Sequence, residues 1–313
     1  MFDLQPFMHE VLKKKINCLA VTVRQNNEIL NKFSWNDAYT RDRCNVNSIS
    51  KSVTSLAVGI AQQEGLLNIN DRVIDYFPED VPDPMPRYLD ELTIRHLLTM
   101  TAGYAKNTLP RPARDLLEDP NWVKYIFSQE IVYQPGTFFV YDNGCTFLCS
   151  KIIEKRSGQT LLNYLKPRLF TPLGIMNPQW FTSPLGTSLG CSGLHLDTKE
   201  LTEIGQVCLD GGLWKGQQLV PADYLKEATS PQSIARYQYH KTPQKDFCGG
   251  YGYFFWMNET VPGYRGFGNF GQEMIVLPQY NAVVGIAAFD PDDQGILDAV
   301  WEGIIPVFES QGI

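Results

Sequence analysis

Apolar residues near the amino end of the chain follow first a helical and then a strand spacing. Residues 4–12 carry apolar side chains about one helical turn apart, with polar residues between them, which predicts an amphipathic helix. Two β-rich runs follow at residues 18–24 and 28–34, separated by a glutamine and two asparagines. This arrangement predicts a hairpin.

The carboxyl end has a similar composition of elements. Residues 251–257, 273–277 and 282–289 are strand-like, and a turn signal, Pro-Gln-Tyr-Asn, separates the last two runs. A closing helix is expected after them, with one apolar face formed by Ile296, Leu297, Val300, Ile304 and Phe308. The two ends of the chain are therefore expected to form one antiparallel sheet with terminal helices packed on it.

The middle of the chain has helical periodicities and frequent Pro and Gly. We expect an α/β (α+β) fold, in which an antiparallel sheet domain is formed by residues 1–65 and 235–313. Residues 66–234 are expected to form a mainly helical insertion, with the active site at the interface of the two. The expected helices are 91–101, 144–157, 160–168 and 199–212, and the expected loops are 104–120 and 178–192.

Composition and charge exclude several classes of protein. The net charge of −7 and the lack of long basic runs argue against a nucleic-acid-binding protein. No apolar run reaches the roughly 18 residues that a membrane span needs. Seven cysteines without C-x-x-C spacing and only four unclustered histidines predict no metal site. The cysteines and the amino-terminal pattern, which has no secretory signal, predict a cytoplasmic protein.

The sharpest candidate for chemistry is Ser48-Ile49-Ser50-Lys51, an S-x-x-K motif at the start of a predicted apolar helix that runs to about residue 64. A hydroxyl at a helix start lies near the positive end of the helix dipole, which favours a developing alkoxide. Lys51 lies one turn further on the same face and can accept the hydroxyl proton if burial lowers its pKa. A helix start with a solvated lysine is the alternative interpretation.

A second motif, Tyr141-Asp142-Asn143, follows a Pro-Gly turn and a short extended segment. A phenol has a pKa near ~10 and becomes a useful general base only beside positive charge, which Lys51 would supply. Asn143 can accept a hydrogen bond from a lysine and donate one to a substrate carbonyl. A buried tyrosine with a satisfied hydroxyl is the alternative for Tyr141.

With these motifs, the chain resembles the serine β-lactamase and penicillin-binding-protein superfamily, in its class C β-lactamase-like branch. That branch includes carboxylesterases, D-aminopeptidases and 6-aminohexanoate-oligomer hydrolases. The resemblance covers nearly the whole chain. Besides the two motifs it rests on residues 64–71, 76–79, 92–103, 135–137, 172–175 and 211–220.

The resemblance implies roles for single residues. Ser48 resembles the nucleophile that forms an acyl-enzyme, Lys51 and Tyr141 its base system, and Asn143 the amide that orients the substrate. The stretch Asn269-Phe270-Gly271-Gln272 resembles the third family motif, K-T-G or H-x-G, on an edge strand. By this alignment the oxyanion hole is formed by the N–H groups of Ser48 and Gln272.

The chain departs from the family pattern at two positions. Asn269, which would help to orient the substrate, stands where the family carries lysine or histidine, the cation that helps to bind the β-lactam carboxylate. Asp142 replaces the usual serine or alanine. The first departure favours an esterase or amidase over an efficient β-lactamase. Cleft residues are expected among Tyr104, Trp122, Trp256, Tyr264 and Arg265, of which the arginine is a candidate substitute for the missing cation.

These observations predict a serine hydrolase that acts on a small ester, amide or short peptide through an acyl-enzyme on Ser48. No metal or organic cofactor is implied, and the oligomeric state is left open. The alternative is a protein that binds penicillin or a peptide, or is acylated once, without turnover. The departures at Asn269 and Asp142 favour this alternative, whereas the intact Ser48, Lys51, Tyr141 and Asn143 oppose it.

Overall fold

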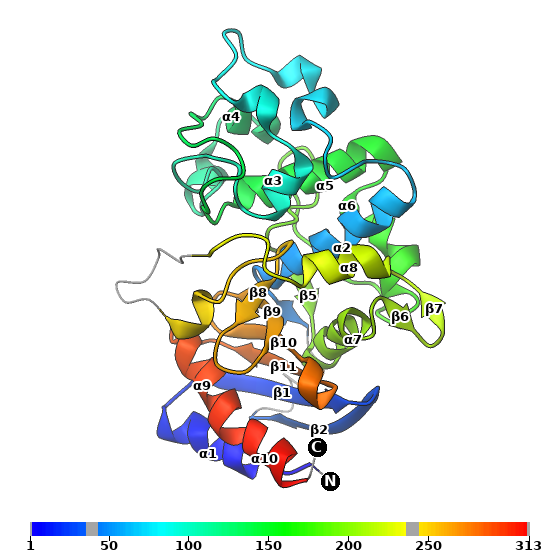
Figure 1. The fold of residues 1–313 in the computed structure, drawn as a ribbon, viewed down its shortest axis with the longest axis vertical. Helices are drawn as coiled ribbons and strands as arrows, with labels where there is room; N and C mark the ends of the chain where they lie inside the picture. Colours follow the sequence, from blue (N-terminus) through cyan, green and yellow to red (C-terminus); the bar gives the residue numbers. More distant parts are fainter. Residues whose placement is uncertain (1, 36–42, 236–243, 312–313) are drawn as a thin grey trace.

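The computed structural model describes residues 2–35, 43–235 and 244–311. Its main layer is a six-stranded antiparallel sheet in the order β2-β1-β11-β10-β9-β8, in which strands from both ends of the chain lie side by side (Figure 1). This confirms the predicted fold class. The strands are β1 (Cys18–Gln25), β2 (Glu28–Ser34), β8 (Trp256–Asn258), β9 (Gly263–Gly268), β10 (Gln272–Leu277) and β11 (Ala282–Ala288).

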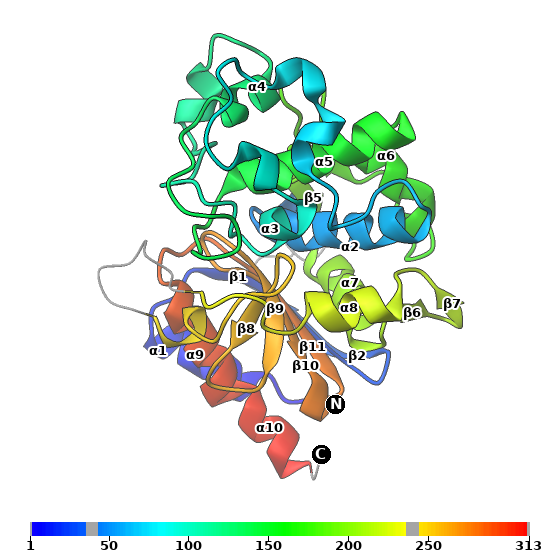
Figure 2. The same ribbon diagram turned by 45° about the horizontal axis from the view of Figure 1, so that its top comes forward.

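Helices cover both faces of this sheet. The terminal helices α1 (Gln5–Lys13), α9 (Asp293–Gly303) and α10 (Ile305–Ser310) pack together on one face (Figure 2). On the other face, α7 (Thr198–Leu209) contacts β11, β10 and β1, and α2 (Ile49–Gln63) contacts β9. The predicted closing helix is thus two helices, because Pro306 cannot donate a backbone hydrogen bond within a continuing helix.

The remaining helices lie mostly beyond α2, at the top of Figure 1. Helix α5 packs against both α2 and α3, so the apolar α2 is enclosed between the sheet and the helical region. Thirteen of the 15 residues of α2 are buried, which explains its nearly continuous apolar and small-residue sequence. These helices are α3 (Ile94–Leu98), α4 (Trp122–Phe127), α5 (Asn143–Ser157), α6 (Leu161–Leu165) and α8 (Ala222–Ala228).

Short strands complete the fold. β3 (Cys44–Asn45), β5 (Leu194–Leu196) and β4 (Gln179–Trp180) form a small sheet, of which β3 comes directly before α2 in the chain. β6 (Leu213–Trp214) pairs with β7 (Gln217–Gln218). The domain boundaries stay a prediction, and α7, which lies within the range expected to form the insertion, packs on the main sheet.

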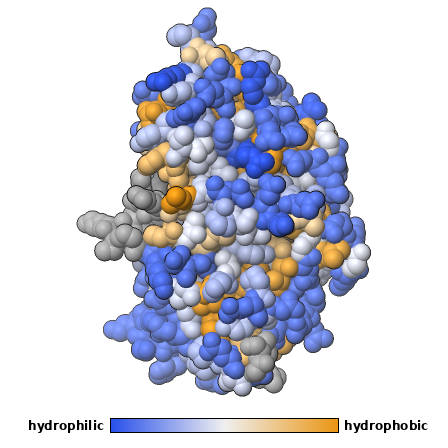
Figure 3. Space-filling model, in the orientation of Figure 1, coloured by the Kyte–Doolittle hydropathy of each residue, from blue (hydrophilic) through white to orange (hydrophobic). Residues whose placement is uncertain are grey.

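The described helices include none that is both long and apolar enough for a bilayer crossing. The face of the molecule in Figure 3 is largely hydrophilic, with apolar side chains scattered between polar ones.

Candidate active site

The turn before α2 fixes the position of the candidate nucleophile. Asn47 has a left-handed backbone (φ 47°), a conformation that asparagine tolerates better than most residues, and Ser48 follows it as the N-cap of α2. The Asn47 side chain donates a hydrogen bond to the carbonyl oxygen of Asn269 at 2.8 Å. The backbone carbonyl oxygen of Asn47 accepts a hydrogen bond from the Ser50 hydroxyl at 2.7 Å. The half-buried Ser48 is therefore held between the start of a buried helix and the β9–β10 turn.

Lys51 lies one turn after Ser48 and is 1 % exposed. Its Nζ donates hydrogen bonds to Ser48 Oγ at 3.0 Å, Asn143 Oδ1 at 2.8 Å and the Cys191 carbonyl oxygen at 3.0 Å. Burial lowers the pKa of Lys51 to about 8, and the positive charge of Arg114 adds to this effect. An amine with such a pKa is neutral in a substantial fraction of molecules at slightly alkaline pH, so it can act as a base.

Tyr141 lies on the other side of the same hydroxyl. Its phenol forms a hydrogen bond with the Ser48 side chain, and its ring centroid is 4.7 Å from Lys51 Nζ. Burial raises the pKa of Tyr141 above its usual value. The ring stacks on Trp256 with centroids 5.7 Å apart and planes 24° apart. Trp256 therefore supports the phenol from behind and does not face the nucleophile.

The start of α5 positions the next two residues of the Tyr-Asp-Asn motif. Asp142 is the N-cap of α5 and is 1 % exposed. Its carboxylate accepts hydrogen bonds from the N–H of Gly144 and from both the N–H and the hydroxyl of Thr108. Burial raises the pKa of Asp142 to about 6. Asn143 donates from Nδ2 to the Leu109 carbonyl oxygen at 3.0 Å while Oδ1 accepts from Lys51.

The β9–β10 turn, residues 269–271, approaches Ser48 from the sheet. A Cβ added to Gly268 would lie 2.3 Å from the Val46 carbonyl oxygen, so only glycine lets the end of β9 come this close to the segment before Ser48. Asn269, exposed at the tip, lines the cavity beside Ser48. Gln272 lies at the start of β10, and its buried side chain donates to the Ala288 carbonyl oxygen.

Two cavities meet at Ser48 and share Ser48, Arg111, Asn143 and Asn269. The first, of about 440 Å³, is called here the tyrosine pocket and also contains Asn107, Pro110, Tyr141, Phe270, Pro291 and Asp293. The second, of about 450 Å³, is called the arginine pocket. It also contains Asn45, Asn47, Arg114, Asp115, Phe181, Thr182, Leu189 and Ser192. Gln272 is not among the described residues that line either pocket.

The residues expected to line the cleft lie elsewhere. Arg265 is fully buried, and its guanidinium lies 3.6 Å from the carboxylate of Glu273 and 2.9 Å from Asn258 Oδ1. It points into the protein and is no cation of the site. None of the five lines either pocket in the described part of the chain, because all are core residues with at most 7 % exposure: Tyr104, Trp122, Trp256, Tyr264 and Arg265.

Sequence reasoning missed the two arginines of the site. Arg114 lies in the short 3-10 helix Ala113–Leu116, and Arg111 lies two residues before it. Both belong to the segment 104–120, which was expected to be a loop. The segment Arg-Pro-Ala-Arg-Asp carried no specific signal, since arginines in a loop are mostly exposed and only the fold shows that Arg114 is buried beside the nucleophile. Only the fold brings that loop to the nucleophile.

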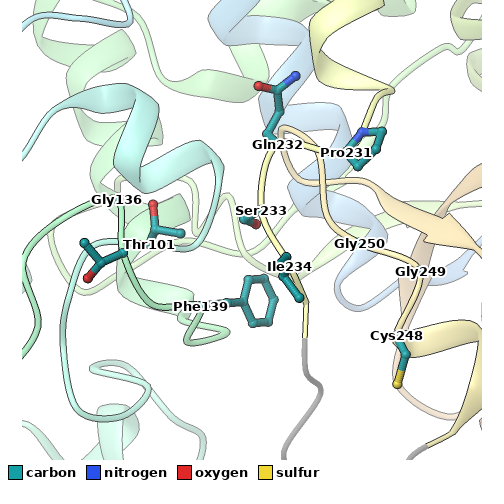
Figure 4. Close-up of a pocket in the computed structure, with 11 residues that line it drawn as sticks. Thr101, Gly136, Phe139, Pro231, Gln232, Ser233, Ile234, Cys248, Gly249 and Gly250 are labelled. Atoms are coloured by element: carbon teal, nitrogen blue, oxygen red, sulfur yellow. The ribbon is translucent and has the colours of Figure 1, made fainter.

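A third cavity, of about 460 Å³, contains no candidate catalytic residue (Figure 4). Phe139 and Ile234 project toward one another inside it, and Cys248 lies on the opposite wall. The Phe139 ring also packs edge-on against Trp256, the tryptophan behind Tyr141. An aromatic layer thus lies between this cavity and the tyrosine pocket. Among the described residues, no cluster of three His, Cys, Asp or Glu side chains could hold a metal ion.

Comparisons with known proteins identify relatives of the chain. A β-lactamase from Yersinia enterocolitica is 32% identical over 128 residues, which are 41% of this chain and 31% of that protein. A lovastatin esterase from Penicillium rubens is 26% identical over 157 residues, 43% of this chain and 38% of that one. The matched stretches thus span about a third of these two relatives.

The fold has close structural counterparts. The structure of a 6-aminohexanoate-dimer hydrolase homologue from Bacillus anthracis superposes with a TM-score of 0.78 at 17% identity, covering 96% of this chain and 81% of the other. The sequence model of the β-lactamase family matches residues 4–295. The chain therefore belongs to the β-lactamase family, within the serine β-lactamase and penicillin-binding-protein superfamily.

Proposed function

We propose that the protein is a serine hydrolase that cleaves an ester or amide through an acyl-enzyme on Ser48. The observation that carries the proposal is the contact of Lys51 Nζ with Ser48 Oγ at 3.0 Å, by a lysine whose pKa is lowered to about 8. A nucleophile in hydrogen-bond contact with a base of near-neutral pKa is the arrangement that covalent catalysis requires.

Lys51 and Tyr141 divide the proton transfers. The neutral Lys51 takes the proton of the Ser48 hydroxyl while Oγ attacks the substrate carbonyl. Because its pKa is raised, Tyr141 stays protonated, so it suits a relay that delivers a proton to the leaving group. Lys51 passes its proton on to Tyr141, which replaces the proton given to the leaving group and leaves Lys51 neutral again. Lys51 then takes a proton from the water that attacks the acyl-enzyme, and Tyr141 returns one to Ser48 Oγ as it leaves, after which the Lys51 proton restores Tyr141. Asn143 holds Lys51 and keeps a second amide hydrogen for the substrate.

The oxyanion of the tetrahedral intermediate needs two donors near Ser48. The N–H of Ser48 is one of them. For the second donor we favour the N–H of Asn269, because Asn269 lines both pockets at Ser48 and its carbonyl oxygen is bound by Asn47. The alignment with the third family motif favours the N–H of Gln272 instead. We assign Gln272 to the support of the β9–β10 turn, because it begins β10 and its buried side chain binds the Ala288 carbonyl oxygen. Loss of one such donor typically lowers kcat by about 10²–10³.

Esters or amides are better candidate substrates than β-lactams, since Asn269 is neutral and the buried Arg265 does not replace the missing cation. Of the two arginines at the site, Arg114 lines only the arginine pocket, and Arg111 is exposed and paired with Asp115. Nitrocefin and p-nitrophenyl acetate are compared on the same preparation. We expect the ester to have the higher kcat/KM. Efficient hydrolysis of nitrocefin would contradict the argument from the neutral third motif. A cytoplasmic location stays a prediction from the sequence.

Steady-state hydrolysis of p-nitrophenyl esters by wild type, Ser48→Ala and Ser55→Ala tests the proposal. Ser55 is a buried serine of the same helix whose hydroxyl contacts Tyr224, so its variant controls for loss of a helix hydroxyl. We expect turnover by wild type and Ser55→Ala, and none by Ser48→Ala. A single stoichiometric burst of p-nitrophenol without turnover would favour the non-turnover binding protein instead.

A further inference from the structure

The guanidinium of Arg114 is buried without a full set of strong partners. Arg114 is 6 % exposed and lines the arginine pocket beside Ser48. It donates to Cys191 Sγ at 3.2 Å and to Ser192 Oγ at 3.3 Å, two acceptors weaker than a carboxylate. Within the described residues its Nε makes no hydrogen bond, although Asp115 Oδ1 lies 3.5 Å away.

A second arginine, Arg111, lines the same pocket. The Arg111 side chain is 68% exposed, and its Nε donates to Asp115 Oδ2 at 3.1 Å. One carboxylate, Asp115, is therefore shared by two arginines, and the third-motif residue Asn269 adds no charge. The arginine pocket keeps a net positive charge in a protein whose net charge is −7. A buried guanidinium with spare donors in such a pocket is suited to a planar anion.

The two pockets differ in the part of the substrate that each can receive. Tyr141, the proton donor to the leaving group, lines the tyrosine pocket and is not among the described residues of the arginine pocket. The leaving group therefore enters the tyrosine pocket, and the acyl chain enters the arginine pocket. Phe181 and Leu189 give the latter an apolar wall against which a short methylene chain can pack.

We propose that the preferred substrates carry a carboxylate at the far end of the acyl chain, bound by Arg114 and Arg111, so that the enzyme cleaves half-esters or half-amides of dicarboxylic acids. This inference rests on the proposed hydrolase activity and adds the substrate class. The competing explanation is that the two arginines serve only to order their loop through Asp115.

Three p-nitrophenyl esters with acyl chains of similar length separate these explanations. They are mono-p-nitrophenyl adipate, its methyl ester, and p-nitrophenyl 6-aminohexanoate, which carry an anionic, a neutral and a cationic end. We expect kcat/KM to fall in this order, with the anionic ester at least about tenfold above the neutral one, because the charge-assisted contact is made at a desolvated site. Equal values for the first two, or a preference for the neutral ester, would overturn the proposal.

Variants locate the preference on the arginines. We expect Arg114→Gln to reduce the ratio of the anionic to the neutral ester by about tenfold, and Arg111→Gln to reduce it less, since solvent screens an exposed charge. Arg72→Gln is the control for Arg111→Gln, because Arg72 also forms an exposed ion pair, with Asp75, outside both pockets. If Arg114→Gln does not fold, the wild-type ratio and Arg111→Gln decide.

Further outcomes separate this proposal from the proposed function. If Arg114→Gln and Arg111→Gln both keep the wild-type ratio, as the Arg72→Gln control should, the acyl-carboxylate proposal is wrong while the hydrolase stands. If Ser48→Ala hydrolyses the three esters as wild type does, the hydrolase proposal fails and this one fails with it.

Discussion

Lys51 gives all three hydrogens of its ammonium group to acceptors, and this sets the chemistry at the scale of single residues. A lysine with Ser48, Asn143 and a carbonyl oxygen as partners is well bound as a cation, yet burial disfavours the charge and lowers its pKa to about 8. The opposing effects leave the amine close to the point at which it loses its proton.

The rate of ester hydrolysis should therefore depend on the protonation of Lys51. The neutral amine is the active form, so kcat/KM for p-nitrophenyl acetate is expected to rise with pH, with a midpoint near 8. Arg114→Gln removes a positive charge that lowers the Lys51 pKa, which moves the midpoint to higher pH. Rates measured between pH 6 and 9.5 check both. A rate that is flat, or that falls with rising pH across 8, would be inconsistent with Lys51 as the base.

Tyr141→Phe isolates the proton relay from the packing of the ring. The phenylalanine ring can still stack on Trp256, so the free energy of unfolding should change by no more than about 1 kcal/mol. The value of kcat should fall by about 10²–10⁴. An ethyl ester has a poorer leaving group than a p-nitrophenyl ester and depends more on protonation of that group. The reduction of kcat in Tyr141→Phe should therefore be larger for the ethyl ester. Equal losses for both esters would argue against the relay.

At the scale of elements, the two helix starts and four of the six strands of the main sheet were predictable, whereas the strand expected at 251–257 overlaps only the first two residues of β8 (Trp256–Asn258). Ser48, Lys51, Tyr141 and Asn143 were found because short motifs at fixed spacing place side chains on known faces of a turn or helix. Strand β9 (Gly263–Gly268) was missed, since five of its six residues are buried and it has neither alternation nor β-branched residues. Its glycines serve close contacts that a one-dimensional pattern does not reveal.

Gly268→Ala tests the closest of these contacts. The new Cβ would meet the Val46 carbonyl oxygen at 2.3 Å, so we expect a loss of about 1–3 kcal/mol in the free energy of unfolding and a displaced β9–β10 turn. The control is Gly285→Ala, in which the Cβ meets the Thr198 carbonyl oxygen at 2.4 Å, between the sheet and α7. Urea denaturation should show similar losses, whereas kcat of the folded protein should fall only in Gly268→Ala. Similar kcat values in Gly268→Ala and Gly285→Ala would show that the position of the β9–β10 turn does not affect catalysis.

At the scale of the whole molecule, the site is assembled from three separate parts of the chain. The start of α2, the start of α5 and the β9–β10 turn meet at Ser48, with the segment that holds Arg111 and Arg114 beside them. Motifs could predict the first two parts, and the resemblance of residues 269–272 to the third family motif indicated the third. The lining of the pockets could not be predicted, because the expected aromatic residues are buried by packing that no local pattern encodes, as Trp256 behind Tyr141 illustrates.

A buried ion pair joins two strands of the sheet behind the site. The side chains of Arg265 and Glu273 are both fully buried, and Arg265 also lies over the Phe247 ring at 4.5 Å. Glu273→Ala would leave the guanidinium of Arg265 without its carboxylate, so we expect the free energy of unfolding to fall by about 3–5 kcal/mol. The double variant Arg265→Met with Glu273→Leu should show a smaller loss in the free energy of unfolding than Glu273→Ala, because no buried charge is left unpaired. A loss under about 1 kcal/mol in Glu273→Ala would contradict the expected cost of leaving Arg265 without its buried carboxylate.

The most direct test of Ser48 as the nucleophile is the intact mass of the protein after reaction with a fluorophosphonate, followed by mapping of the adduct. We expect one adduct per chain, on the peptide that contains Ser48, with Ser55→Ala labelled like wild type and Ser48→Ala unlabelled. An adduct on another serine, or equal labelling of Ser48→Ala, would contradict the assignment of Ser48 as the nucleophile.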